Sequence, residues 1–287
     1  MLEQVLLELR QLNATLAKLV PTPPSPPDLA SGRAFRWLGQ DKPCPLSPID
    51  PIKTIRLEDL KGIDRQKAAL ISNTRQFLKG LPANNALLWG ARGTGKSSLI
   101  QALLNAYGDE GLRIIEVARQ DLQELADIQT LLKDRPEKFI LYCDDLSFEA
   151  DDANYKALKA ILEGSMAQPP SNLLIYATSN RRHLLPEYLE ENHQARWVDG
   201  ELHQGEAVEE KLSLSERFGV WLAFHTFDQQ QYLDVVEYWL ERLGFQKDRE
   251  SARTEALAYA LLRGSRSGRV ASQFAKDWAG KRQLDPS

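Results

Sequence analysis

The chain has 287 residues, of which 43% are hydrophobic and 26% are charged, and its formal net charge is −4. This composition is typical of a globular protein, and the length allows one large domain with a small one. The charge excludes a general attraction to nucleic acid or anionic lipid, and no segment approaches the ~20 apolar residues that span a bilayer. Cys44 and Cys143 are the only cysteines, and the N-terminus lacks the pattern of a secretory signal, so we expect a cytoplasmic protein.

Residues 1–20 predict an amphipathic helix, because leucine and valine recur at spacings of three and four from Leu2 to Leu19. This helix either packs on the chain's own domain or binds a partner. Residues 21–50 begin with "PTPPSPPDLASG", which predicts a stiff, extended linker. The remainder predicts an irregular but ordered segment in which Phe35 and Trp37 are buried.

Residues 51–227 alternate between helical and strand patterns, which predicts an α/β domain with a parallel sheet covered on both faces. The predicted helices are 64–79, 95–107, 120–133 and 152–164, and the predicted strands are 85–90, 112–118, 138–146, 172–180 and 219–227. Residues 228–287 read as helices alone and predict a small helical lid. The long acidic stretch "PEYLEENHQARWVDGELHQGEAVEEKLSL" interrupts the α/β pattern and predicts a partner or regulatory loop.

A glycine-rich bend between a predicted strand and a predicted helix matches G-x-x-x-x-G-K-[ST]. Glycines let successive backbone N–H groups converge on a phosphate at the positive end of the helix. Lys96 should reach the β- and γ-phosphates, and the Ser97 hydroxyl should bind Mg²⁺. The predicted phosphate-binding residues are Gly90, Ala91, Arg92, Gly93, Thr94, Gly95, Lys96, Ser97 and Ser98.

The stretch "FILYCDDLSFE" places two carboxylates after an apolar strand. Open α/β sheets bind their ligands at the carboxyl ends of the strands. Asp144 is therefore a predicted Mg²⁺ ligand with Ser97, and Asp145 is predicted to polarise an attacking water.

With both motifs in place, the chain resembles the AAA+ superfamily of P-loop ATPases over residues 55–280. More narrowly it resembles a bacterial ATP-binding family, domain of unknown function 815. The stretches that carry this resemblance are "LKGIDRQKAALISNTRQFLKGLPANNALLWGARGTGKSSL", "CDDLSFE", "YATSNRRHLLPE", "LSERFGVWLAF" and "SGRVASQF". The resemblance implies ATP and Mg²⁺ as ligands, a five-stranded parallel core with a helical lid, and assembly into homo-oligomers.

The resemblance also implies roles for residues outside the two motifs. Gly62 and Ile63 correspond to the segment that contacts the adenine base. Asn180 corresponds to the sensor-1 residue that orients the attacking water.

Arginines complete the implied site. Arg217 resembles the arginine finger that reaches the nucleotide of a neighbouring subunit, and Arg181 and Arg182 are alternatives to it. Arg269 resembles the sensor-2 arginine of the lid, and Arg266 is the alternative.

Two features depart from the superfamily. The usual Asp-Glu pair is Asp-Asp here, so the second carboxylate is one methylene shorter and turnover could be slow. The segment "EVARQDLQELADI" has no aromatic residue and no glycine, which disfavours threading of polypeptides.

We therefore predict a Mg²⁺-dependent ATPase that remodels or loads a macromolecular client, a protein rather than DNA. The alternative is a nucleotide-gated adaptor or loader that hydrolyses slowly or not at all, and that could be associated with DNA.

Overall fold

The computed structural model describes residues 28–30, 32–148, 152–163, 170–182, 184, 196–198, 201–203, 214–245 and 248–284. The predicted N-terminal helix and most of the proline-rich and acidic segments lie outside these ranges. Within them, no helix is long and apolar enough to cross a membrane.

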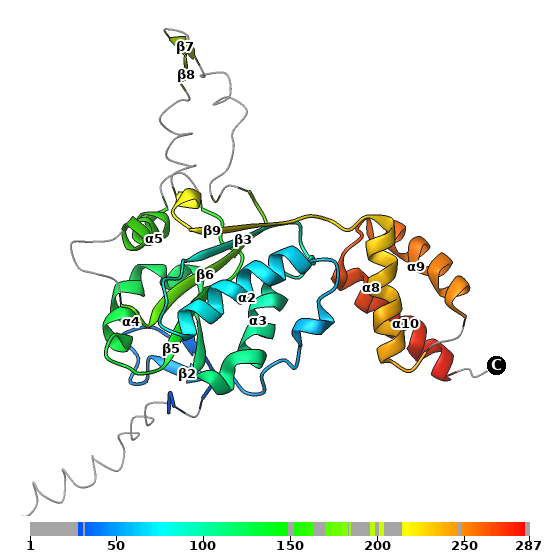
Figure 1. The fold of residues 1–287 in the computed structure, drawn as a ribbon, viewed down its shortest axis with the longest axis horizontal. Coiled ribbons are helices and arrows are strands. Elements are labelled where there is room, and N and C mark those ends of the chain that lie inside the picture. The colour runs from blue at the N-terminus through cyan, green and yellow to red at the C-terminus, as the bar shows by residue number, and fades with distance from the viewer. Residues whose placement is uncertain are drawn as a thin grey trace, which may run out of the picture.

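One sheet of seven strands organises the molecule, in the order β2-β1-β4-β5-β6-β3-β9 (Figure 1). Neighbouring strands pair in parallel, except that β2 is antiparallel to β1. The strands are β1 Ala34–Trp37, β2 Leu46–Pro48, β3 Ala86–Gly90, β4 Leu112–Glu116, β5 Lys138–Cys143, β6 Leu173–Ser179 and β9 Val220–Phe224. The short strands β7 Arg196–Val198 and β8 Glu201–His203 form a separate antiparallel pair.

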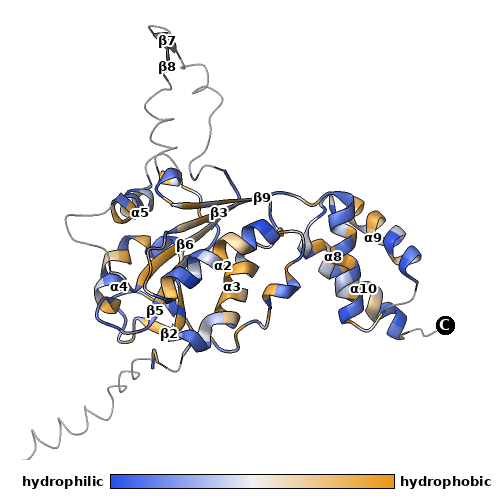
Figure 2. Cartoon of the chain, in the orientation of Figure 1, coloured by the Kyte–Doolittle hydropathy of each residue, from blue (hydrophilic) through white to orange (hydrophobic). Residues whose placement is uncertain are grey.

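Helices cover both faces of the sheet, as the sequence predicts. On one face lie α2 Asp64–Leu78 and α3 Lys96–Tyr107, and on the other lie α4 Leu125–Leu132 and α5 Ala153–Glu163. Alternate residues of the strands enter the two hydrophobic cores, because successive side chains of a strand point to opposite faces. Ile140 and Tyr142 of β5 join the first core, whereas Leu141 and Cys143 join the second. Apolar residues accordingly concentrate on the strands and the inner sides of the helices (Figure 2).

After β9 the described chain is helical, with α8 Gln229–Arg242, α9 Arg249–Arg263 and α10 Gly268–Leu284. Asp228 begins α8 with a capping box, in which its carboxylate accepts from the Gln231 N–H at 2.8 Å and Gln231 accepts from the Asp228 N–H at 3.1 Å. These helices lie beside the sheet, next to the α2 and α3 layer (Figure 1).

The segment before residue 50 differs from the expectation of irregular structure, because β1 and β2 extend the main sheet. Phe35 and Trp37 are buried as predicted, and β1 pairs with β4 some 80 residues later in the chain. Exposed Arg36 interrupts the apolar pattern of β1 and forms an ion pair with Glu116 on β4 at 2.9 Å. A four-residue strand of this kind depends on a distant partner, so the local pattern did not reveal it, and the predicted five strands became seven.

Candidate functional site

The loop between β3 and α3 carries Lys96 into a half-enclosed position beside the strand ends. Lys96 is 6% exposed, and its Nζ donates to the carbonyls of Gly90 at 2.7 Å and Ala91 at 2.8 Å and to Asn180 Oδ1 at 3.2 Å. Burial lowers the pKa of Lys96, and the carboxylates of Asp145 and Asp144 offset part of that effect. A bound anion would compensate the buried ammonium in the same way.

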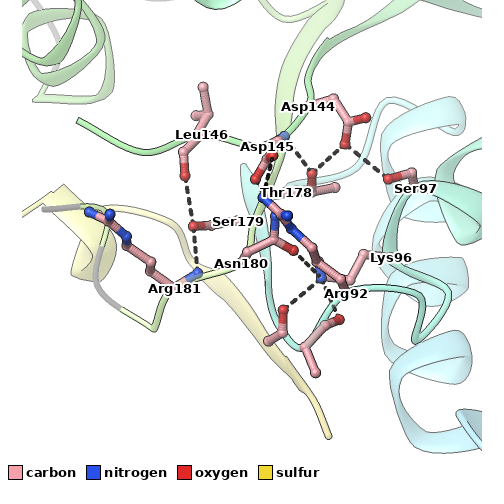
Figure 3. A network of polar contacts seen from close by, with 12 residues as sticks. Arg92, Lys96, Ser97, Asp144, Asp145, Leu146, Thr178, Ser179, Asn180 and Arg181 are labelled. Atoms are coloured by element: carbon pink, nitrogen blue, oxygen red, sulfur yellow. Dashed lines mark hydrogen bonds and ion pairs between the residues drawn. The ribbon is translucent and has the colours of Figure 1, made fainter. Parts of the chain in front are cut away.

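Asp144 follows β5 and lies beside the first turn of α3 (Figure 3). Its Oδ1 accepts from the Ser97 hydroxyl at 2.9 Å and from the Thr178 hydroxyl at 2.5 Å. Burial acts to raise the pKa of Asp144, but the hydrogen bonds from Thr178 and Ser97 outweigh it and hold the pKa below its ordinary value. An ionised carboxylate beside a hydroxyl is a hard oxygen donor set, which fits a Mg²⁺ ion.

Asp145 is exposed to the cavity and is held by polar partners from two other segments. Its carboxylate accepts from Asn180 Nδ2 and lies 3.8 Å from the Arg92 guanidinium (Figure 3). Its backbone N–H donates to Thr178 Oγ1 at 2.9 Å. Thr178 thus fixes both aspartates, a role that the sequence analysis missed because a threonine inside an apolar strand carries no distinctive signal.

A cavity of about 720 Å³ connects these groups with the helices that follow β9. This volume lies within the range of ligand pockets. The predicted residues on its wall are residues 92–98, Ile63, Asp144, Asp145, Asn180 and Arg269. Gly90 and Ala91 are not on the described wall, but their carbonyl groups accept hydrogen bonds from Lys96.

Of the two predicted base-contacting residues, one lines the cavity and the other does not. Ile63 is buried and lines the cavity. Gly62 is not among the lining residues in the described chain, and a Cβ there would lie 3.4 Å from the ring of Phe227. Phe227 lines the cavity itself, as do Val235 and Trp239 of α8. The sequence analysis missed these three, because apolar residues before and within a helix look like ordinary core.

The structure distinguishes the two sensor-2 candidates by position. Arg269, in the first turn of α10, lines the cavity, and its backbone N–H donates to the Gly93 carbonyl at 3.2 Å. Arg266 is absent from the described cavity wall, and its carbonyl accepts from the Phe227 N–H at 3.0 Å.

None of the three finger candidates lines the described part of its own chain's cavity. Arg217 follows a helical turn at residues 214–216 and contacts Glu163, at the end of α5, at 2.6 Å. Arg182 lies over the rings of Trp89 and Trp221, at 5.7 and 5.8 Å from their centroids. Arg181 is exposed, and its backbone N–H bonds to the Ser179 hydroxyl.

A family profile described as "Protein of unknown function (DUF815)" matches residues 30–282. The chain belongs to this family.

Solved structures show the fold of this DUF815 protein to be that of AAA+ ATPases. RuvB from Thermotoga maritima superimposes with a TM-score of 0.55 at 15% identity, covering 82% of this chain and 68% of RuvB. The FIGL-1 AAA domain in complex with ADP gives a TM-score of 0.53 at 16% identity, covering 81% of this chain and 75% of that domain.

A match over a shorter stretch is to the replication factor C large subunit of Staphylothermus marinus, which is 35% identical over 79 residues. That match covers 27% of this chain and 18% of the subunit.

Proposed function

We propose that this DUF815 protein is a Mg²⁺-dependent ATPase that couples its nucleotide state to the remodelling or loading of a protein client. The observation that carries the proposal is the convergence of Lys96, the Ser97–Asp144 pair and the Asp145–Asn180 pair on one cavity. A site that only held a nucleotide would need the first two groups but not a carboxylate and amide beside them.

Each group has a distinct role in this proposal. Lys96 and the loop N–H groups bind the phosphates, and Ser97 and Asp144 would hold Mg²⁺, which neutralises phosphate charge when bound. Asp145 accepts a proton from the attacking water, and Asn180, which already contacts both Asp145 and Lys96, orients that water. Arg269 is placed beside Gly93 to neutralise the terminal phosphate from the lid side.

The proposed enzyme is a homo-oligomer in which Arg217 acts on the neighbouring subunit's nucleotide. Its place outside its own chain's described cavity wall supports action in trans. The ion pair with Glu163 at 2.6 Å would hold the guanidinium in one orientation before the subunits meet.

Steady-state ATP hydrolysis measured against protein concentration tests the proposal. Turnover per subunit should rise with concentration, and Arg217→Ala should lower it by about 10³-fold. Arg135→Ala is the matched control, because the Arg135 side chain pairs with nearby Glu137 and is not on the described cavity wall.

Mixing two inactive variants tests action in trans directly. Arg217→Ala lacks the finger but keeps the phosphate site, and Lys96→Ala lacks the phosphate site but keeps the finger. In a mixed oligomer, some interfaces therefore combine an intact phosphate site with an intact finger. Recovery of part of the activity is expected, and a mixture as inactive as its components would mean that Arg217 does not act across subunits.

A nucleotide-gated adaptor is the second candidate, and the contacts of Asp145 favour it. Asn180 and Arg92 both engage the carboxylate that would have to accept a proton. Micromolar binding of ATP without turnover at any protein concentration would establish the adaptor and reject the enzyme.

A protein client is favoured over DNA by the pairing of basic residues in the helices after β9. Arg249 pairs with Glu241, Arg253 with Glu237 and Arg282 with Asp248. Paired arginines release few counterions on binding a phosphate backbone. The name of replication factor C suggests the DNA alternative, and DNA binding that weakens steeply with salt would support it.

A further inference from the structure

A buried carboxylate joins the segment before α2 to helix α8 at the wall of the cavity. Asp59, in the 3₁₀ turn Leu57–Asp59, lines the cavity although its side chain is only 1% exposed. Its carboxylate accepts from the Tyr238 hydroxyl at 2.6 Å, from the Arg242 guanidinium and from the Arg56 N–H at 2.8 Å. Tyr238 and Arg242 are one helical turn apart, so one face of α8 supplies both donors.

The same two residues of α8 also pack against Trp239. Trp239 lies between them in the sequence, and it lines the cavity. The rings of Tyr238 and Trp239 meet edge to face, with centroids 5.7 Å apart. The Arg242 guanidinium lies over the Trp239 ring at 5.5 Å. Each donor to Asp59 is therefore also a packing partner of the indole.

This arrangement is separate from the phosphate-binding machinery. In the described chain, no hydrogen bond or ion pair of Asp59, Tyr238 or Arg242 reaches the loop of residues 90–97. Lys96 instead donates to Asn180, and Asp144 accepts from Ser97, at the strand ends. The cavity thus has an apolar wall that includes Ile63 and Trp239, and Trp239 lies on the helix that Asp59 contacts.

A buried carboxylate is costly unless its hydrogen bonds are satisfied, so its contacts hold only when α8 is in register with the segment before α2. If α8 shifted by a fraction of a turn, Asp59 would lose its two α8 donors together, whereas Trp239, whose ring contacts lie within α8, would move with the helix. The contacts therefore restrict α8, and Trp239 with it, to one position.

We propose that Asp59, Tyr238 and Arg242 form a clamp that positions Trp239 as a wall of the site for the purine base of the bound nucleotide. The three are positioning residues for base affinity, and the phosphates are bound without them. This inference rests on the proposed function, since it takes the cavity to hold a nucleotide.

Calorimetric binding of two ligands, ADP and inorganic tripolyphosphate, separates the base site from the phosphate site. Tyr238→Phe and Asp59→Asn should raise the Kd of ADP by about tenfold or more. Each variant weakens the contact of α8 with Asp59, so α8 no longer holds Trp239 in one position. Both variants should bind tripolyphosphate within about twofold of the wild-type Kd. Trp239→Ala should reproduce the ADP defect without disturbing the clamp's charges.

Arg253→Gln is the matched control, because Arg253 pairs with Glu237 between α8 and α9 without touching Asp59. It should change neither Kd. Tyr238→Phe removes a single hydroxyl, so it remains informative if Asp59→Asn fails to fold.

Unchanged ADP affinity in Tyr238→Phe and Asp59→Asn would overturn the clamp, and so would an equal loss of affinity for both ligands. Wild-type protein that binds neither ligand would instead reject the proposed function itself.

Discussion

At the scale of single residues, the backbone conformation of Asp145 favours a short polar side chain at this position. Its backbone lies in the left-handed region, with φ of 52°. Asp and Asn enter this region more readily than longer side chains, because their polar groups can bond locally. The backbone N–H bonds to Thr178, which fixes this conformation. From the sequence we predicted only a shorter reach, whereas the structure adds a conformational reason for it.

The sensor-2 assignment makes a prediction with a built-in control. Arg269→Ala should lower ATP turnover by about 10²-fold or more, because a positioned charge at the terminal phosphate is lost. Arg266→Ala should leave turnover within about twofold, since Arg266 is absent from the described cavity wall. Steady-state kinetics of the two purified variants check this. A larger defect in Arg266→Ala would reverse the assignment.

At the scale of elements, the close approach of β3 and β9 makes the start of the phosphate loop intolerant of a side chain. Gly90 has φ of 130°, and a Cβ there would lie 1.9 Å from the carbonyl oxygen of Phe224. The next residue uses that same carbonyl, since the Ala91 N–H donates to it at 3.1 Å. The first glycine of the motif is therefore required by strand packing as well as by the path of the loop.

Gly90→Ala should lower the free energy of unfolding by about 3 kcal/mol or more. The cost of the positive φ and the cost of the clash with the Phe224 carbonyl add together. Gly80→Ala is the control, since Gly80 also has positive φ, 69°, but meets nothing within 4 Å. That variant should lose only about 1–2 kcal/mol. Urea denaturation of both measures the difference, and equal losses would show that the approach of β9 costs nothing.

At the scale of the whole molecule, the cavity is shared between the sheet and the helices after β9. Lys96, Asp144 and Asn180 come from the strand ends, whereas Trp239 and Arg269 come from α8 and α10. A ligand that contacts both groups would stabilise their present arrangement, because binding favours the state that makes more contacts with it. The contacts of Asp59 with α8 are the charged link between the two parts at this wall.

This link should make stability depend on pH. Burial acts to raise the pKa of Asp59, but hydrogen bonds from Tyr238 and Arg56 and the charge of Arg242 lower it overall. A lowered folded-state pKa means that the ionised group stabilises the fold above its unfolded pKa of about 3.9. That contribution is lost as the pH falls below this value, through the folded pKa.

The free energy of unfolding of the wild type should therefore be about 1–3 kcal/mol larger than that of Asp59→Asn between pH 7 and about pH 5. The difference should shrink below about pH 4. Urea denaturation across this range measures it, with Asp109→Asn as a control at an exposed ion pair with Arg33. A difference that grows on acidification would contradict the lowered pKa.

By itself, the sequence determined the elements whose signals are local. The order of helices and strands from α2 to α10, apart from β7 and β8 in the acidic stretch, follows from apolar periodicity, and the phosphate loop and paired aspartates follow from motifs at fixed spacing. Lys96, Ser97 and Asp144 were predicted because each lies at the end of a recognisable strand or the start of a recognisable helix, whereas Asn180 was predicted only from the family resemblance.

Only the tertiary structure decided the features that join distant segments. Strand β1 was missed because its partner is β4, and Thr178, Phe227 and Trp239 because their surroundings come from elsewhere in the chain. The choice of Arg269 over Arg266 in the cavity wall, and the burial of Asp59 against α8, depend on how the last helices lie beside the sheet. Periodicity records which face of an element is buried, but the packing of side chains against distant neighbours decides what that face meets.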